Sequence, residues 1–327
     1  MKARHLSTSF ATIYALGLLD QVRVIRRGPD GFWGPWAATG SNAKRLVQAG
    51  PVTAVIGVDD RVAIYDQLPG RARHTWDFQA SDLSAAGLSR GGSVLLASAG
   101  GRVWGTERDS ALAPWTRWVP LGGPVDGLVV AATPKGALTV CARVDGEVHC
   151  LSRPERSATW SAWESLGSPG GGAEDLALVV MSRGGMAVFA IGRDGAVHHR
   201  WQDRPGSPWN EWVSLGGLAR SLSVTRTASG GLALFITGHA GRVGTRYQSR
   251  PFGRWTPWFD LHGDARAVFA QQSYTEGLEA FVLGTDDEVR HAWCARLGTP
   301  WTEWQLLERE FAGLRLDSPQ ERALPAG

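Results

Sequence analysis

Short apolar stretches alternate with turns rich in glycine, aspartate and serine along most of the chain. A representative segment has such stretches at residues 176–181, 186–191, 197–201 and 209–215, and the Arg-Asp-Gly turn 193–195 separates the second from the third. Runs this short, rich in Val, Leu, Phe and Ala and bounded by turn residues, are typical of β-strands. Long helical periodicity is absent, so the pattern predicts an all-β protein built from four-stranded units.

The pattern repeats, and tryptophan marks each copy. Trp-x-x-Trp occurs six times, and one further copy keeps only its second Trp, with Arg73 in the first place. The second Trp of the copies is Trp36, Trp76, Trp118, Trp163, Trp212, Trp258 and Trp304. Spacings of 40 to 49 residues between positions of so rare an amino acid indicate seven copies of one structural unit.

A second landmark recurs in step with the tryptophans. A turn rich in Gly and Asp is followed by a valine, at Val22, Val62, Val103, Val148, Val197, Val243 and Val289. Because both landmarks move together, whole units repeat. Repeats of this length with short strands predict a single domain over residues 1–327, a seven-bladed β-propeller of four-stranded antiparallel blades.

The closure of the ring is also predicted from the spacing. A first strand starts nine residues after the second Trp of the preceding unit, as Ala267 does after Trp258. The same offset from Trp304 leads to residues 313–317, whereas only residues 1–9 precede the second strand of the first unit. We expect residues 313–317 to complete the first blade, so that the C-terminal strand closes the ring and removes an open sheet edge.

Composition limits the class of partner. The chain has 42 Gly and 16 Trp but only three Lys, which argues against a helical protein. A net charge of +3 and scattered arginines give no indication of a nucleic-acid partner. No apolar run approaches the roughly 18 residues of a membrane helix, so no membrane insertion is expected. The sequence leaves homo-oligomerisation open.

The N-terminal segment resembles a secretion signal in composition but belongs to the repeat. Lys2 and Arg4 precede the apolar residues 10–19, yet residues 15–22 match residues 55–62 at the offset of 40 that separates the first two units. A removed leader would not share the repeat, so we expect a cytoplasmic protein without a signal peptide.

Three cysteines complete the candidate chemistry of the fold. Cys141 and Cys150 flank a predicted hairpin with an Asp145-Gly146 turn, which places them opposite each other. A disulfide is geometrically feasible there, but reduced thiols are the expected state in the cytosol. Cys294 has no partner nearby in the sequence, and no Cys-x-x-Cys motif indicates a zinc site.

Two segments carry a resemblance to a known family. Residues 160–167 read Trp-Ser-Ala-Trp-Glu-Ser-Leu-Gly, and residues 209–217 read Trp-Asn-Glu-Trp-Val-Ser-Leu-Gly-Gly. They resemble the repeat of PLL-type bacterial lectins, as does the preceding segment 187–201. The resemblance covers nearly the whole chain and is strongest in units four to seven. It implies a seven-bladed propeller that binds L-fucose and related sugars in clefts between neighbouring blades.

Units five to seven keep the most complete set of aromatic residues. Four positions after the landmark valine they carry an aromatic ring, where the other units carry a polar or charged residue. An apolar sugar face stacks on such a ring, and nearby polar groups contact its hydroxyls. The predicted ligand-binding residues are therefore Trp201, Arg204, Trp209, Tyr247, Arg250, Trp255, Trp293, Arg296 and Trp301.

The recurring arginines and tryptophans have alternative structural roles. An arginine lies five to seven residues after the valine in six units, as Arg27, Arg108, Arg153, Arg204, Arg250 and Arg296. Each would either donate hydrogen bonds to sugar hydroxyls or stack on the following Trp, and we favour the stacking interpretation. The second Trp of each pair is expected in the core between blades, and the first is the better candidate for a pocket.

Catalytic chemistry has little support in the sequence. His198, His199 and His291 fall on predicted third strands, and adjacent strand residues point to opposite faces, so His198 and His199 cannot share a site. No metalloprotease motif, nucleophile elbow or paired-carboxylate motif occurs, so no catalytic residue, metal or cofactor is assigned.

Three functions are consistent with these patterns. A multivalent carbohydrate-binding lectin is favoured, because several weak sites on a rigid ring gain avidity. A biosynthetic enzyme of the cyclase or lyase type, with a single specialised site, would account for the divergence of the first three units. A protein-interaction scaffold is the third, and no sequence feature identifies its partner.

Overall fold

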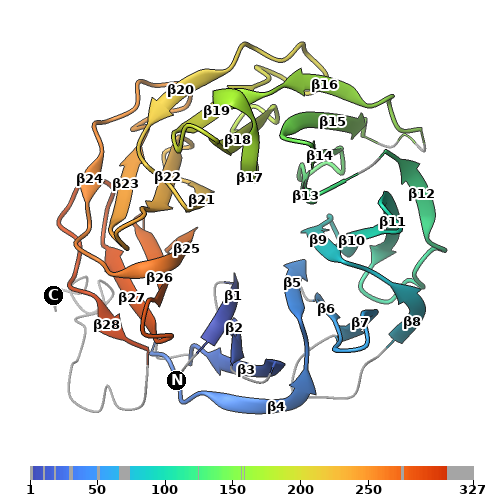
Figure 1. Cartoon of the computed structure of the whole chain (residues 1–327), viewed down its shortest axis with the longest axis horizontal. Coiled ribbons are helices and arrows are strands. Elements are labelled where there is room, and N and C mark those ends of the chain that lie inside the picture. The colour runs from blue at the N-terminus through green and yellow to red at the C-terminus, as the bar shows by residue number, and fades with distance from the viewer. Residues whose placement is uncertain are drawn as a thin grey trace, which may run out of the picture.

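Seven β-sheets surround the centre of the molecule in a closed ring (Figure 1). The computed structural model describes residues 3–9, 12–17, 20–28, 32–49, 52–65, 74–123, 125–155, 157, 159–273 and 276–307. Within this part of the chain, each sheet has four antiparallel strands that follow one another from the centre of the ring to its rim. The predicted seven-bladed β-propeller is confirmed.

The blades are numbered in chain order, and the first four contain the following strands. Blade 1 consists of β1 (Ala3–Ser9), β2 (Thr12–Gly17), β3 (Gln21–Arg26) and β4 (Ala37–Asn42). Blade 2 consists of β5 (Arg45–Ala49), β6 (Val52–Ile56), β7 (Arg61–Tyr65) and β8 (His74–Gln79). Blade 3 consists of β9 (Asp82–Gly87), β10 (Gly91–Ala99), β11 (Arg102–Ser110) and β12 (Val119–Gly122). Blade 4 consists of β13 (Gly127–Ala132), β14 (Leu138–Val144), β15 (Glu147–Arg153) and β16 (Glu164–Gly167).

The remaining three blades follow a short 3-10 turn, η2 (Pro169–Gly171). Blade 5 consists of β17 (Ala173–Val180), β18 (Met186–Gly192), β19 (Val197–Trp201) and β20 (Val213–Gly216). Blade 6 consists of β21 (Ser221–Arg226), β22 (Leu232–Thr237), β23 (Val243–Tyr247) and β24 (Phe259–Asp260). Blade 7 consists of β25 (Ala265–Gln272), β26 (Leu278–Gly284), β27 (Val289–Cys294) and β28 (Gln305–Leu306).

The Gly/Asp-rich landmark turn joins the second and third strands of every blade. Two residues before each landmark valine, the backbone is left-handed, with φ between 60° and 83°. Glycine adopts this conformation freely, and aspartate tolerates it better than most residues. The seven residues are Asp20, Asp60, Gly101, Gly146, Gly195, Gly241 and Asp287. The geometry of one hairpin therefore explains why the landmark recurs.

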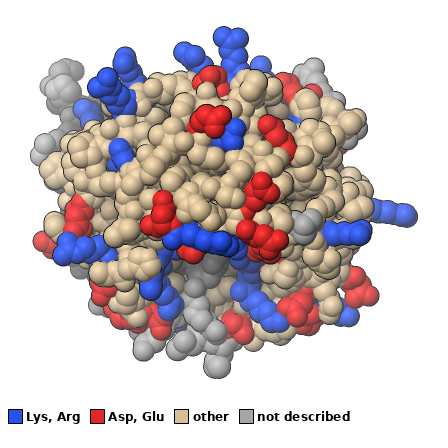
Figure 2. Space-filling view, turned by 45° about the horizontal axis from the view of Figure 1, so that its top comes forward, with Lys and Arg blue, Asp and Glu red and all other residues tan. Residues whose placement is uncertain are grey.

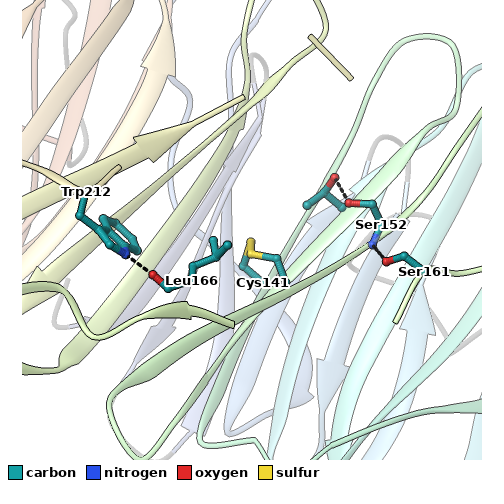
Figure 3. The surroundings of a disulfide bond; sticks show 7 residues. Cys141, Ser152, Ser161, Leu166 and Trp212 are labelled. Atoms are coloured by element: carbon teal, nitrogen blue, oxygen red, sulfur yellow. Dashed lines mark hydrogen bonds between the residues drawn. A yellow bond between two sulfur atoms is a disulfide. The ribbon is translucent and has the colours of Figure 1, made fainter. Parts of the chain in front are cut away.

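The second Trp of a pair joins its blade to the preceding one. In five blades its indole Nε1 donates a hydrogen bond to a leucine carbonyl oxygen at the outer strand of the preceding blade. These bonds are Trp36 to Leu307, Trp163 to Leu121, Trp212 to Leu166, Trp258 to Leu215 and Trp304 to Leu261. Figure 3 shows the bond from Trp212 to Leu166, which is 2.6 Å long. The expected inter-blade role of the second Trp is confirmed in these blades.

Blade 1 packs directly on blade 7 and so closes the ring. Trp36 bonds to Leu307, and Arg27 forms an ion pair of 2.7 Å with Glu279, whose side chain is buried. Strand β1 pairs with β2 and occupies the innermost place of blade 1, which the sequence assigned to residues 313–317. Residues 313–317 themselves lie outside the described residues. A seven-residue strand from the N-terminal segment is thus long enough to serve as the inner strand.

Cys141 and Cys150 lie opposite each other on β14 and β15 and are joined by a disulfide (Figure 3). The Asp145-Gly146 turn between the strands is confirmed, and both of its residues have positive φ. The expectation of reduced thiols is wrong for this structure, because direct cross-strand pairing brings the two buried sulfur atoms within bonding distance. Cys294 is buried and unbonded.

The described residues contain neither a membrane-spanning helix nor a metal-ligand cluster. No helix in the described ranges is long and apolar enough to cross a bilayer, and the same ranges contain no group of three or more potential metal ligands. On the face shown in Figure 2, acidic and basic side chains are interspersed.

Candidate functional site

A cleft opens between blades 6 and 7. Its cavity has a volume of about 750 Å³ and is lined by Thr245 and Tyr247 of β23, by residues 259–262 and by residues 298–304. Pockets of a few hundred cubic ångströms are typical for small organic ligands. The cleft is therefore large enough to hold a small carbohydrate.

Four aromatic rings contribute to the wall of this cleft. Tyr247 and Phe259 are nearly parallel, with ring centroids 6.0 Å apart, and Trp301 and Trp304 lie on the side of blade 7. Phe259 is 45% exposed, so part of its ring is accessible to a ligand. The cleft therefore offers ring surface on two walls, one from each blade.

Carboxylates supply the charged groups of the cleft. Asp260 accepts a hydrogen bond of 2.7 Å from Arg242, and the backbone amide of His262 also donates to it. Burial raises the pKa of Asp260, but these two hydrogen bonds and the nearby charges outweigh burial and lower that pKa below its ordinary value. Glu303 is exposed and has no ion-pair partner among the described residues. The cleft is lined by no Lys or Arg side chain.

The neighbouring cleft between blades 5 and 6 shows what fills the equivalent space elsewhere. His199 stacks between Phe189 and Trp201, with ring centroids 5.5 and 5.0 Å away. Arg246 reaches from β23 toward blade 5, where it donates a hydrogen bond of 2.6 Å to the carbonyl oxygen of Leu215. Burial and, secondarily, the Arg246 charge lower the pKa of His199 from 6.5 to about 4, so its ring is neutral near pH 7.

Two smaller side chains take these places between blades 6 and 7. Two residues after the landmark valine, Thr245 stands where blade 5 has His199. Three residues after it, Ala292 stands where blade 6 has Arg246. The registers agree, because Arg246 pairs with Leu234 and Ala292 pairs with Ala280 at the same place in their sheets. The loss of a histidine and an arginine explains why this cleft is open.

The clefts between blades 7 and 1 and between blades 3 and 4 retain an arginine. Between blades 7 and 1, His291 stacks on Phe281 and Trp293, and Arg27 lies 4.5 Å from the ring centroid of Trp33. Between blades 3 and 4, Arg153 pairs with Glu107, and a cavity of only about 40 Å³ remains. An arginine of the chain therefore occupies the space that ligands would need in these clefts.

The structure divides the nine predicted ligand-binding residues among several places. Tyr247 and Trp301 line the 750 Å³ cavity together. Trp201 and Trp293 stack on histidines in the flanking clefts, and Trp255 lies beneath Arg246. Trp209 is 7% exposed and belongs to the core between blades 4 and 5. The loop arginines Arg204, Arg250 and Arg296 are exposed and lie outside the cavity lining.

The stacking interpretation of the recurring arginines holds for three of the six. The guanidinium groups of Arg27, Arg108 and Arg153 lie 4.5 to 5.2 Å from the ring centroid of the first Trp in their own blades. The other three, Arg204, Arg250 and Arg296, have no such ring contact among the described residues. In blades 5 and 6, Arg200 and Arg246 instead reach the preceding blade, where each donates a hydrogen bond to a leucine carbonyl oxygen. Both lie three residues after the landmark valine, outside the spacing of five to seven residues.

Several lining residues were not predicted from the sequence. Phe259 and Asp260 follow the second Trp of blade 6, and Glu303 lies between the two tryptophans of blade 7. The residue types at these places change from repeat to repeat, so they carry no recurring signal. The sequence does contain a sign of the open cleft. Thr245 and Ala292 are small residues at fixed distances from the landmark valine, where other blades have a histidine or an arginine. A small residue carries no chemical group that marks a site, so its effect on the cleft is apparent only in the structure.

His198 and His199 point to opposite faces of β19, as predicted. His198 lies 3.0 Å from a carboxylate oxygen of Asp194, whereas His199 is enclosed by aromatic rings. The two imidazoles therefore belong to separate environments, and neither lines the cleft between blades 6 and 7.

The chain was compared with protein-family models, curated proteins and solved structures, and only solved structures match it. No family model matches the chain, and no curated protein matches it. A fucose-specific lectin from Aleuria aurantia is 13% identical, covers 91% of this chain and 92% of its own, and has a TM-score of 0.57. SapL1 lectin in complex with alpha methyl fucoside is also 13% identical, with 94% and 96% covered and a TM-score of 0.56. BBS1N in complex with ARL6DN is 10% identical, with 91% and 94% covered and a TM-score of 0.62.

These likenesses concern architecture. At 10–13% identity they show that the chain shares the β-propeller fold with lectins and with a protein-binding propeller. Propellers support unrelated activities, so the function is argued from the cleft.

Proposed function

We propose that the chain is a lectin-like propeller that binds carbohydrate in the cleft between blades 6 and 7. The observation that carries the proposal is the 750 Å³ cavity lined by four aromatic rings and two carboxylates, at an inter-blade position that arginines fill elsewhere. Aromatic rings would stack on the apolar face of a sugar, while Asp260, Glu303 and the threonine hydroxyls would bond to its hydroxyl groups.

A fucose-type sugar is the first candidate ligand. Fucose carries an apolar methyl group, which suits a pocket with an exposed phenylalanine edge. The shared fold of a fucose-specific lectin and of a lectin bound to alpha methyl fucoside adds support to this choice. The mechanism requires no group other than the side chains and backbone of the cleft.

Binding should depend on the rings of this one cleft. We expect Tyr247→Ala to weaken binding of a sugar identified on a glycan array by about tenfold, the size expected for one lost stacking contact. Trp201→Ala is the matched control, because Trp201 has the same place in blade 5 but faces a cleft that Arg246 fills. Calorimetric titration of both variants, with a melting curve for each, makes the comparison.

Two outcomes would contradict the proposal. Equal loss of binding in both variants would move the site away from the cleft between blades 6 and 7. A full array without a saturable carbohydrate ligand would remove carbohydrate binding altogether.

A further inference from the structure

An arginine accompanies the tryptophan pair in five blades. In blades 5 and 6 it lies three residues after the landmark valine, and in blades 1, 3 and 4 it lies five residues after it. The residues are Arg27, Arg108, Arg153, Arg200 and Arg246. Blade 7 has Ala292 and Cys294 at the two positions. Blade 2 has Tyr65 and Gln67 there, and Gln67 lies outside the described residues.

Each of these arginines places its guanidinium group at the boundary with the preceding blade. There it lies against a tryptophan of its own blade or donates to a leucine carbonyl oxygen of the preceding blade. The guanidinium of Arg246 lies 5.7 Å from the ring centroid of Trp255 and 5.3 Å from that of Trp258, within the range of cation–π attraction. It shares the carbonyl oxygen of Leu215 with the indole of Trp258. Arg200 likewise shares Leu166 with Trp212.

The cleft between blades 6 and 7 has the same receptor groups without the cation. Within the described residues, the carbonyl oxygen of Leu261 accepts one side-chain hydrogen bond, from Trp304. No Arg or Lys of the described chain lies over the rings of Trp301 or Trp304. A carbonyl oxygen has two lone pairs, so Leu261 retains the acceptor capacity that an arginine uses in the other two clefts.

The charge of the cleft matches a cation. Asp260 is held ionised, and Arg242, which pairs with it, is 74% exposed and is not among the residues that line the cavity. Glu303 adds a second carboxylate without an ion-pair partner in the described chain. Two carboxylates and four electron-rich ring faces favour a positively charged ligand group, and the lining contains no Lys or Arg. The imidazole of His262 also lines the cleft and lies 3.7 Å from Asp260.

We propose that the ligand of this cleft is an amino sugar whose free, protonated amine takes the position that an arginine of the chain takes in neighbouring clefts. This inference rests on the proposed carbohydrate-binding function and specifies its ligand class. The ammonium group would lie against Trp301 and Trp304 and donate to Leu261, and Glu303 would supply the opposing charge.

The test compares matched sugars that differ only at one substituent. We would titrate three amino sugars calorimetrically into the full chain at pH 6, where their amines are charged. They are glucosamine, galactosamine and mannosamine, and each is compared with its N-acetyl form and its neutral parent hexose. We expect at least one free amine to bind about tenfold more tightly than its N-acetyl and neutral counterparts, as one partly desolvated cation contact would produce.

Two variants locate the effect. Glu303→Gln should lower the affinity for the free amine more than the affinity for the neutral hexose, and so reduce the preference for the amine. Glu211→Gln is the matched control, because Glu211 holds the same place between the tryptophans of blade 5, and it should change neither.

The outcomes separate this inference from the function on which it rests. Equal or tighter binding of N-acetylated or neutral sugars would overturn the amino-sugar inference and leave carbohydrate binding in place. Absence of binding by every sugar of this panel and by fucose would overturn both, even if arginine amide bound in the cleft.

Discussion

At two positions on the third strands, a histidine and an arginine fill the space between blades 5 and 6. Thr245 and Ala292 hold the equivalent positions facing the space between blades 6 and 7. Each exchange removes a large polar side chain, and together they leave the rings of Tyr247 and Trp301 accessible. The site is thus defined by the small side chains of Thr245 and Ala292 as much as by its aromatic rings.

The rings of the site were predictable, but its location was not. Tyr247 and Trp301 follow from the repeat register, because aromatic residues at fixed distances from a landmark are visible in any sequence. Openness depends on side-chain volumes contributed by two different blades, and Arg246 enters the neighbouring cleft from a position that periodicity alone does not mark. The repeat register also selected Trp209, which is buried in the core and is not accessible to a ligand.

The buried histidine of the closed cleft makes stability depend on pH. The pKa of His199 falls from 6.5 to about 4 on folding, through burial and then the Arg246 charge. The unfolded chain therefore binds a proton first as pH falls, so stability is full above about pH 6.5 and decreases down to pH 4. The difference corresponds to about 3 kcal/mol for complete protonation.

His199→Phe should remove this part of the acid sensitivity. Phenylalanine keeps a ring between Phe189 and Trp201 but does not titrate. Melting temperatures measured between pH 7 and pH 4.5 should fall less for the variant than for the unaltered chain. Identical slopes for the two proteins would show that His199 contributes nothing to acid destabilisation.

Strands and turns repeat more faithfully than the clefts between them. All seven landmark turns require a left-handed residue, which explains why Gly and Asp were a sound guide to the hairpins. The ends of the ring follow no such rule. The spacing predicts an inner strand from residues 313–317 because residues 1–9 are few, yet β1 pairs with β2 over six register positions.

Deletion of the inner strand tests the closure of blade 1. Removing residues 3–9 should expose the edge of β2 and abolish the cooperative melting transition, because blade 1 would lose contacts with both of its neighbours. Circular dichroism melting of this variant and of one lacking residues 308–327 makes the comparison. Loss of the transition only in the second variant would instead assign the inner strand to residues 313–317.

The molecule as a whole is a ring of similar blades whose interfaces have different contents. Fold class was predictable because a period of 40 to 49 residues, read from two landmarks, permits few architectures. The contents of the clefts were not, because they depend on side chains from two blades. The cavity between blades 6 and 7 has a volume of about 750 Å³ and the cavity between blades 3 and 4 about 40 Å³, so these two clefts are not equivalent.

Introducing an arginine into blade 7 tests the assignment of the binding site to the cleft between blades 6 and 7. Ala292→Arg should place a guanidinium over Trp301 and Trp304, as Arg246 is placed over its own tryptophans, and should raise the melting temperature or leave it unchanged. The measurement is calorimetric stoichiometry with a carbohydrate ligand. We predict one site per unaltered chain and none in the variant. Undiminished binding by a folded Ala292→Arg chain, or several equal sites per chain, would contradict the assignment of the site to this cleft.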